Sequence, residues 1–545
     1  MTDKADNYNL LVKPWIPILW ADGNPARVSI RTALIEAGRI RQIAASNPMD
    51  NVALLRFLLA VLQWCKPDLT GEDRDEIKNA DGIPEHWLRK RGAEGEAYAA
   101  FELLGAGARF YQDQSLSGEK PKRPVSDLFA YLPADTEINH FRHVYDRTIA
   151  LCPACCAVGL VRLSAAATSG GSGLSPSVNN APPVYSVPIG DSLLETLRLN
   201  WPLHPSEEDD CAAWETGKPR AKRIGVLEGF TWQPRAVWLG PLVEEDRRKC
   251  ARCGSSGRVA CQMVFKKGRS RKADGRAYSD PHVAWLAKKN RPNDGGSDAK
   301  DPALRGPDPL KRSVREAALW CQTGRAVLDT VGDDPPIPSL ACAMERLPKG
   351  LSLRVTCFEP FTKQKKTFDE HRDGWDVSLD LLRSDYLRGL AIEEIRWVEG
   401  LDLSKCLPAR QDCQNAYDAA RQRGASARSD KTKDAAQSII AADVQHRLCD
   451  LFRNFVKDLA KEHTEDAAGR CVTRWRDAAV SLLRDVLDRA CFFSTAGSPL
   501  RRLEAAEITR KKLDQTLEKL AESDRKLPSG PASKRESEPQ KRGRA

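Results

Sequence analysis

The chain has 545 residues, of which 41% are hydrophobic and 29% charged, and its formal net charge is +10. No run approaches the roughly 20 apolar residues that a membrane-crossing helix needs, and the 16 cysteines are scattered, so composition excludes a membrane-spanning protein and a disulfide-built secreted domain. The N-terminus lacks the pattern of a secretory signal. We expect a cytoplasmic protein of more than one domain, whose positive charge is compatible with an acidic partner such as nucleic acid.

The first part of the chain mixes strand and helix signals. Residues 9–30 predict two short β-segments joined by a turn, and a helix with apolar spacing begins at Asp50. Strand-like runs follow at 182–188 and 230–240. The Gly, Pro and charge-rich run 291–312 predicts a surface loop. We interpret residues 1–375 as a mixed α/β N-terminal domain.

The pattern changes after about residue 378. Residues 443–462, 476–493 and 503–522 carry apolar side chains at helical spacing, and strand signals are absent. We expect an antiparallel four-helix bundle over residues 376–525, followed by a disordered charged tail over 526–545. The predicted fold class is therefore α+β.

Two Cys-x-x-Cys pairs stand out among the cysteines. Cys152 and Cys155 form the first, and Cys250 and Cys253 form the second. Four thiolates in two such pairs match a tetrahedral structural zinc (Zn²⁺) site, which has no open position for a reacting water. Because the pairs are far apart in sequence, ordinary unliganded cysteines remain the alternative interpretation.

No catalytic constellation is evident in the sequence. His140 and His143 precede the first cysteine pair, but the glutamate of a zinc deaminase is missing beside them. An ordinary loop role suits these histidines better. We expect a binding protein and no enzyme. The rival hypothesis is a zinc-dependent nucleic-acid enzyme such as a nuclease, and a third is a zinc-braced protein-interaction scaffold.

Three polar stretches are candidate contact elements. The Gly/Ser run 168–177 predicts a flexible loop whose backbone a partner can approach closely. The runs 265–272 and 361–375 concentrate basic side chains that suit phosphate contact. A plain linker is the alternative for the first run, and a solvated turn is the alternative for the other two.

Taken in order, NLLVKPWIPI, CPAC, TSGGSG, GFTWQPRAVWL, KCARCG and the terminal helical pattern resemble the large subunit of Cascade, the type I-E CRISPR surveillance complex (the CasA family). The resemblance implies a non-catalytic subunit that recognises the protospacer-adjacent motif (PAM) of double-stranded target DNA and promotes strand opening and R-loop formation. Its implied partners are guide RNA, the other Cascade subunits and the helicase-nuclease that it recruits.

The resemblance also implies roles for particular residues. The family's glycine loop, which approaches the PAM duplex from the minor groove, corresponds to Gly170, Gly171 and Gly173. A gapless match puts the family's groove-entering lysine on Gly268. Lys267, or else Lys266, would have to take its place.

The family's wedge, a hairpin-tip glutamine that splits the first base pair, corresponds to Gln364, flanked by Lys363 and Lys365. Phe141 matches a loop position that the family places near the guide-RNA end and the PAM. In this interpretation the four cysteines brace the base of that loop and of the lysine hairpin.

Overall fold

The computed structural model describes residues 7–92, 99–105, 107–132, 149–169, 173–201, 210–215, 222–243, 249–283, 338–363, 366–401, 444, 447–494, 503, 507 and 510–520. The chain separates into two compact units. The first consists of Met1–Leu310 with Gln322–Arg388, and the second of Lys311–Cys321 with Gly389–Ala545. The first unit thus extends to Arg388, whereas the sequence pattern suggested a domain limit at residue 375.

The N-terminal segment forms a small antiparallel sheet followed by a long buried helix, α2. Its strands are β1 (Ile16–Trp20), β2 (Pro25–Val28) and β3 (Ile40–Ile43), in the order β2-β1-β3. Helix α2 (Pro48–Cys65) begins two residues before the predicted Asp50, because the Asn47 side chain accepts a hydrogen bond from the Met49 amide. The two β-segments expected in residues 9–30 are confirmed.

The α2 helix carries two fully buried charged residues, Asp50 and Arg56. Arg56 is fully buried and donates to both carboxylate oxygens of Asp280 at 2.7 Å. A bidentate carboxylate of this kind offsets the cost of burying an arginine. His282 completes the group, with its ring nitrogen 3.1 Å from the side-chain oxygen of Asn200. None of the helices in the described part of the chain is long and apolar enough to cross a membrane.

A second sheet and helix α6 form the side of the first unit that carries the cysteines. Helix α6 (Pro153–Ala166) packs against α2, and the sheet has the order β4-β7-β6. Its antiparallel strands are β4 (Arg123–Pro124), β6 (Arg235–Leu239) and β7 (Gln262–Lys267). The strand predicted at 230–240 begins only at Arg235: Phe230 ends the short helix α8 (Val226–Phe230), and residues 231–234 connect it to the strand.

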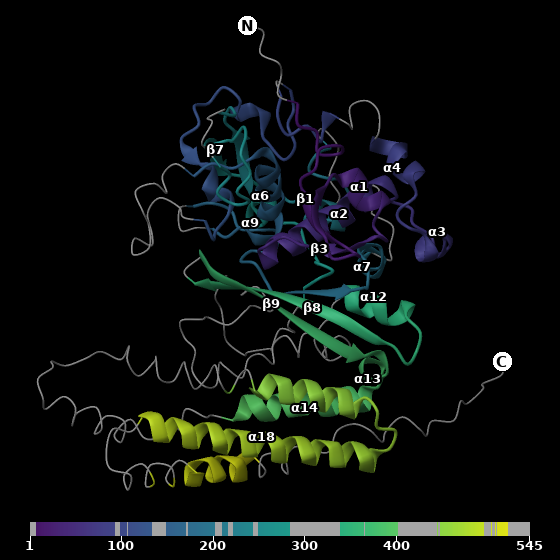
Figure 1. Cartoon of the computed structure of the whole chain (residues 1–545), viewed down its shortest axis with the longest axis vertical. Helices are drawn as coiled ribbons and strands as arrows, with labels where there is room; N and C mark the ends of the chain where they lie inside the picture. Colours follow the sequence, from purple (N-terminus) through teal and green to yellow (C-terminus); the bar gives the residue numbers. More distant parts are fainter. Residues whose placement is uncertain are drawn as a thin grey trace, which may run out of the picture. The chain divides into compact units, whose positions relative to one another are not determined.

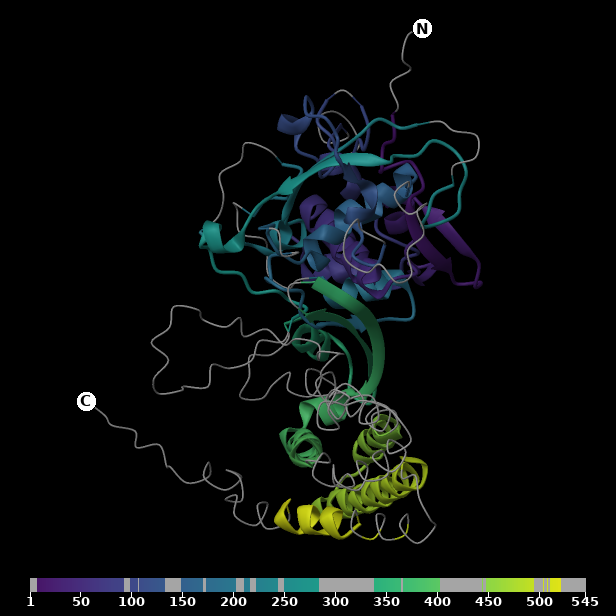
Figure 2. The same cartoon turned by 90° about the vertical axis from the view of Figure 1, so that its left-hand side faces the viewer.

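The third sheet contains a long hairpin. Strands β5 (Tyr185–Ile189), β8 (Ser352–Lys363) and β9 (Lys366–Ser378) lie in the order β5-β8-β9, all antiparallel. Figures 1 and 2 show β8 and β9 as a curved ribbon that runs past α2, α6 and α7 (Leu193–Asn200). Lys363 pairs with Lys366, so residues 364 and 365 connect the two strands.

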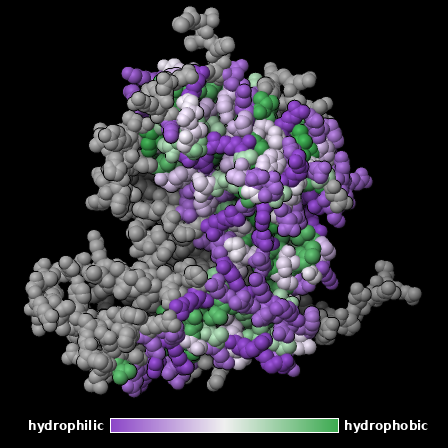
Figure 3. Space-filling model, viewed as in Figure 1, coloured by the Kyte–Doolittle hydropathy of each residue, from purple (hydrophilic) through white to green (hydrophobic). Residues whose placement is uncertain are grey.

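The first unit also contains several shorter helices. They are α1 (Ile30–Ile35), α3 (Gly71–Glu76), η1 (Ile77–Asn79), α4 (Glu85–Gly92), η2 (Gln114–Leu116), η3 (Val125–Leu128), α9 (Arg271–Asp274), α12 (Pro338–Arg346) and α13 (Leu379–Arg383). On the face shown in Figure 3, hydrophobic residues form small groups separated by hydrophilic ones.

The described residues of the second unit are mostly helical, with a turn at residues 460–464. Its helices are α14 (Asp385–Gly400), which begins in the first unit, residues 447–459, α18 (Glu465–Ser494) and residues 510–520. The last three overlap the segments that the sequence pattern predicted to be helical, whereas α14 lies before them. Ion pairs join Arg484 to Asp514 at 2.7 Å and Asp488 to Arg510 at 2.9 Å. Because the residue numbers of the partners in 510–520 fall as those in α18 rise, these two helices are antiparallel. The predicted α+β class is confirmed.

Candidate metal centre and the elements around it

The four predicted cysteines lie together in the first unit. Cys152 caps the N-terminus of α6 and Cys155 lies in its first turn, while Cys250 and Cys253 lie in a tight turn before β7. Their sulfur atoms all lie within 4.8 Å of one another, and the Sγ atoms of Cys152 and Cys253 are 3.7 Å apart. Thiolates around a tetrahedral zinc ion at about 2.3 Å would be about 3.8 Å apart. The cluster therefore has the dimensions of a four-cysteine metal site.

Backbone hydrogen bonds explain why two distant pairs meet. Leu151, just before the first pair, exchanges two hydrogen bonds of 2.9 Å with Ala260, beyond the second pair. The second pair is closed by a turn in which the Gly254 amide donates to the Cys250 carbonyl at 2.8 Å. Gly254 has φ +72°, a conformation that favours glycine. The glycine after the second pair is thus needed by the turn itself.

Two arginines approach the sulfur atoms. Arg27 donates toward Cys152 and Cys155 at 3.9 and 3.8 Å, and Arg252 toward Cys155 at 3.8 Å. A divalent ion held by four thiolates carries a net charge of about −2, which two guanidinium groups offset. Hydrogen bonds from Cys155 and Cys250 hold the pKa of Cys152 far below its usual value, and the same contact raises the pKa of Cys155. Four thiols this close cannot all ionise unless a cation shares the site.

The glycine loop is fastened by Arg235 of β6. This arginine donates to the carbonyl oxygens of Thr168 and Ser175, on either side of the loop. Its side chain is buried beside the Phe265 ring, and burial lowers its pKa to about 10. Gly173, the described member of the loop glycines, has φ +74°. One guanidinium therefore fixes both stems of the loop.

The two candidate lysines occupy opposite faces of β7. Lys267 pairs with Arg235 across the strands, so its side chain leaves the sheet on the face that carries the glycine loop. Lys266 points to the other face, where its Nζ atom lies 2.6 Å from a carboxylate oxygen of Glu119. Lys267 is exposed and has no ion pair among the described residues. Of the two lysines, the geometry thus favours Lys267 as the one that lies on the face of the glycine loop.

Gly268 lies against the backbone of β6. A Cβ atom at this position would be 2.5 Å from the Arg235 amide nitrogen, closer than real contacts allow. The Gly268 carbonyl also accepts a hydrogen bond from the Ser175 hydroxyl at 3.3 Å. A lysine therefore does not fit at position 268 in this structure.

The stems of segment 133–148 meet at the cysteine turn. The Tyr131 hydroxyl, just before the segment, accepts from Arg252 Nε at 3.0 Å and donates to Asp50 at 2.9 Å. After the segment, the Ala150 carbonyl accepts from the Ala251 amide at 2.9 Å. Both ends are thus attached to the two residues between Cys250 and Cys253.

Several predicted residues lie outside the described part of the chain. Among the contact residues these are Gly170, Gly171, Gln364, Lys365 and Phe141, and the same holds for His140 and His143. Lys363 ends strand β8. Sequence reasoning missed three arginines at the site, Arg27, Arg235 and Arg252. Arg235 and Arg252 stand inside the motifs that were singled out, whereas Arg27 has no local signal.

Comparison with known proteins identifies the family. Residues 9–486 match the family described as CRISPR-associated protein Cse1. The chain belongs to this family. The resemblance to the CasA family is thereby confirmed. The chain is 29% identical over 260 residues to CRISPR-associated protein CasA/Cse1 of Thermus thermophilus. That match covers 43% of this chain and 49% of the relative, so it spans about half of the relative's length.

Solved Cse1 structures share the fold of this Cse1-family chain. Cse1 of Acidimicrobium ferrooxidans has a TM-score of 0.65 at 20% identity, covering 95% of this chain and 99% of that one. Cse1 of Thermobifida fusca has a TM-score of 0.64 at 19% identity, with the same coverage. A chain of a CRISPR RNA-guided surveillance complex has a TM-score of 0.62 at 16% identity, covering 93% and 99%.

Proposed function

We propose that this chain is the non-catalytic large subunit of a cytoplasmic type I-E Cascade complex, bound to guide RNA and the other subunits. In this proposal it recognises the PAM of double-stranded DNA, promotes strand opening and recruits the helicase-nuclease. The observation that carries the proposal is the pairing of Lys267 with Arg235, which puts a cation with no ion pair among the described residues beside the loop that Arg235 fastens.

The PAM contact would combine charge with backbone approach. Lys267 supplies salt-dependent attraction to the duplex, and the glycine loop lets the backbone come close to the minor groove. Readout in that groove distinguishes mainly A·T from G·C pairs, so the proposed recognition is permissive. Gly170, Gly171 and Gly173 are the proposed loop contacts, and Lys266 is assigned to the ion pair with Glu119.

Strand opening would begin at the tip of the β8–β9 hairpin. Gln364 is the proposed wedge, with Lys363 and Lys365 in contact with phosphates on either side. Separating one base-pair step opposes stacking of about 1.4 kcal/mol, which a single well-placed side chain can offset. Phe141, in the segment fastened beside the cysteines, is proposed to lie near the guide-RNA end and the PAM.

The cysteines are proposed to bind one structural zinc ion. The four-thiolate set fits zinc, and the neighbouring arginines offset the charge. When bound, the metal would tie the start of α6 to the turn before β7, and thus the glycine loop to the Lys267 strand. Because four cysteines fill a tetrahedral site, the described donors leave no position for a reacting water, which argues against the nuclease alternative. We further propose that the second unit completes a four-helix bundle.

The test is target binding by a guide-RNA complex reconstituted with and without this chain, at fixed salt, on duplexes with randomised PAM sequences. The proposal expects the chain to create binding that depends on the PAM. An equal increase in binding for every PAM sequence would mean that the chain adds only non-specific electrostatic attraction. That result would refute the assignments of the glycine loop and Lys267.

A further inference from the structure

A buried arginine, Arg162, lies where several elements of the first unit meet. It belongs to α6, and its side chain is 2% exposed. It donates to Asp50 at 2.7 Å and to Asn47 at 2.9 Å, both at the N-terminal end of α2. Its other terminal nitrogen donates to Glu370 of β9, whose side chain is 4% exposed. One guanidinium thus joins α6, α2 and the long hairpin.

Two more contacts extend this group. The Arg162 guanidinium lies over the Tyr131 ring, 5.1 Å from its centroid, at the stem of segment 133–148. Asp50 also accepts from Arg252 at 2.6 Å, and Arg252 stands between Cys250 and Cys253. A continuous line of alternating charges therefore runs from the cysteine turn through α2 and α6 to the hairpin.

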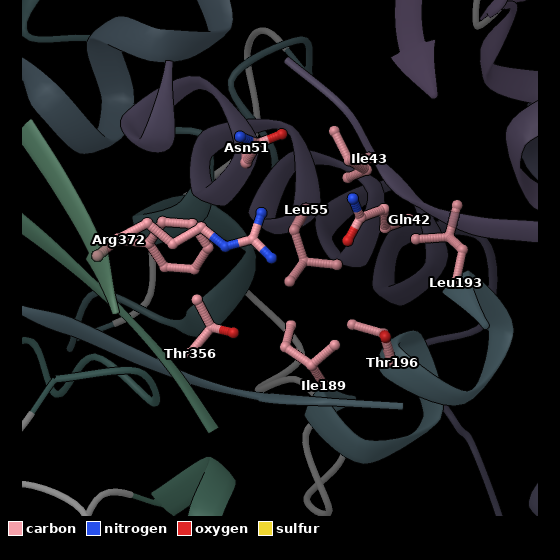
Figure 4. A pocket seen from close by; sticks show the side chains of 10 residues that line it. Gln42, Ile43, Asn51, Leu55, Ile189, Leu193, Thr196, Thr356 and Arg372 are labelled. Atoms are coloured by element: carbon pink, nitrogen blue, oxygen red, sulfur yellow. The ribbon is translucent and has the colours of Figure 1, made fainter. Parts of the chain in front are cut away.

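The position of Glu370 makes it an anchor of the hairpin. It pairs with Pro360 across the strands, four residues after the start of β9. Arg372, two residues later, leaves the strand on the same face, and Figure 4 shows it reaching toward Asn51 and Leu55 of α2 over a small pocket. Arg372 is exposed, whereas Glu370 is buried in an ion pair. Among the described residues, the ion pair with Arg162 is thus a buried charge contact between this face of the hairpin and α6.

The chemistry of arginine suits this position. Its planar fork serves several acceptors at once in fixed directions, which a lysine ammonium does not. Buried charges are tolerated only when they are paired, so each member of the line holds its neighbour in place. Helix α6 also leads directly into the glycine loop at Thr168.

We propose that Arg162 is a positioning residue that fixes the β8–β9 hairpin relative to the described stems of the glycine loop and of segment 133–148. It touches no nucleic acid in this arrangement and acts through Glu370 and Tyr131. The contact of these three elements with DNA rests on the proposed function. The positioning role itself does not depend on the proposed function, because it is tested by amide hydrogen exchange on the protein alone.

The test is amide hydrogen exchange on the full chain carrying Glu370→Gln. This substitution keeps the shape and leaves Arg162 paired with Asp50, so the chain should fold. We expect exchange to rise about tenfold in the hairpin residues nearest the tip, the size expected for weakening one charge-assisted hydrogen bond. Strands β1 and β2 should be unchanged. Arg162→Lys, whose ammonium cannot serve Asp50, Asn47 and Glu370 together, should give at least as large a rise at the same amides.

The matched control is Asp376→Asn on the same strand. Asp376 pairs with Arg354 at 3.0 Å, but both side chains are about half exposed, at 47% and 56%, so little change is expected. If Glu370→Gln behaves like this control, or if exchange rises evenly over the whole first unit, the positioning role is wrong.

Strand opening separates this inference from the proposed function. With a fluorescent base analogue in the first PAM-adjacent pair, Glu370→Gln should slow opening and leave binding to the closed duplex unchanged. Faster hairpin exchange with normal opening would support the positioning role and would remove the hairpin from the opening step.

Discussion

The strongest test of the site compares two adjacent lysines. Lys267→Ala removes an exposed cation that has no ion pair among the described residues, on the face of the glycine loop. Lys266→Ala removes a neighbour on the opposite face whose charge is already shared with Glu119 at 2.6 Å. The two substitutions change net charge equally, so they differ in the face of the strand from which the charge is removed and in whether that charge was already paired.

The expected magnitudes follow from that geometry. If Lys267 binds one DNA phosphate, its replacement should lower the slope of log affinity against log salt by about 0.9, and should weaken PAM-duplex binding about five- to tenfold, or about 1 kcal/mol. Lys266 lies in an exposed ion pair with Glu119, and such pairs contribute less than about 1 kcal/mol to stability. Because this lysine is on the face opposite the glycine loop, its replacement should change DNA affinity less than twofold.

The assay is equilibrium binding of the reconstituted complex to PAM and scrambled duplexes across a salt series. Reduced affinity and slope for Lys267→Ala alone would support the assignment. Equal reductions for both variants would mean that the strand contributes only diffuse charge, and a larger reduction for Lys266→Ala would refute the reasoning from strand faces.

Three further predictions concern the metal, the strand contact and pH. Cys250→Ser should abolish binding of one zinc ion per chain, measured by elemental analysis, and lower the melting temperature by several degrees; unchanged metal content would refute the four-cysteine site. Gly268→Ala should destabilise the protein by about 1–3 kcal/mol in denaturant unfolding, because its Cβ would collide with the backbone of Arg235; a neutral effect would contradict the close packing. Burial lowers the pKa of His282 to about 3, so its neutral form stabilises the fold above the unfolded pKa of about 6.5. Stability should therefore fall by about 1.4 kcal/mol per pH unit as pH drops below 6.5, and His282→Gln should remove that slope.

Local sequence patterns predicted those parts of the structure that depend on local geometry. Apolar spacing identified α2, and the turn between β1 and β2 was visible in the sequence. The Cys-x-x-Cys pairs suggested a shared metal site because the ligand chemistry requires four thiolates, although their separation left this open. The start of β6 was misplaced because Phe230 ends helix α8 and the strand-like residues 231–234 connect that helix to the strand.

The contacts that organise the site had no such signal. Arg27 and Cys152 are 125 positions apart, and Arg162 and Glu370 are 208 positions apart. Nothing in the residues around Arg162 indicates that its partner is on a distant strand. These partners are chosen by the tertiary fold, so only the arrangement of α2, α6 and β9 could identify them.

The attachment of segment 133–148 has a consequence for how this surface can evolve. Its chain enters at Tyr131 and leaves at Ala150, and both ends are bonded to the turn between Cys250 and Cys253. A loop that starts and ends at one fixed point can gain or lose residues without displacing its support. Doubling the length of such a loop costs only about 0.6 kcal/mol in closure entropy. The length of this segment is therefore free to change by insertion or deletion, while the four-cysteine cluster and its neighbouring strands keep their geometry.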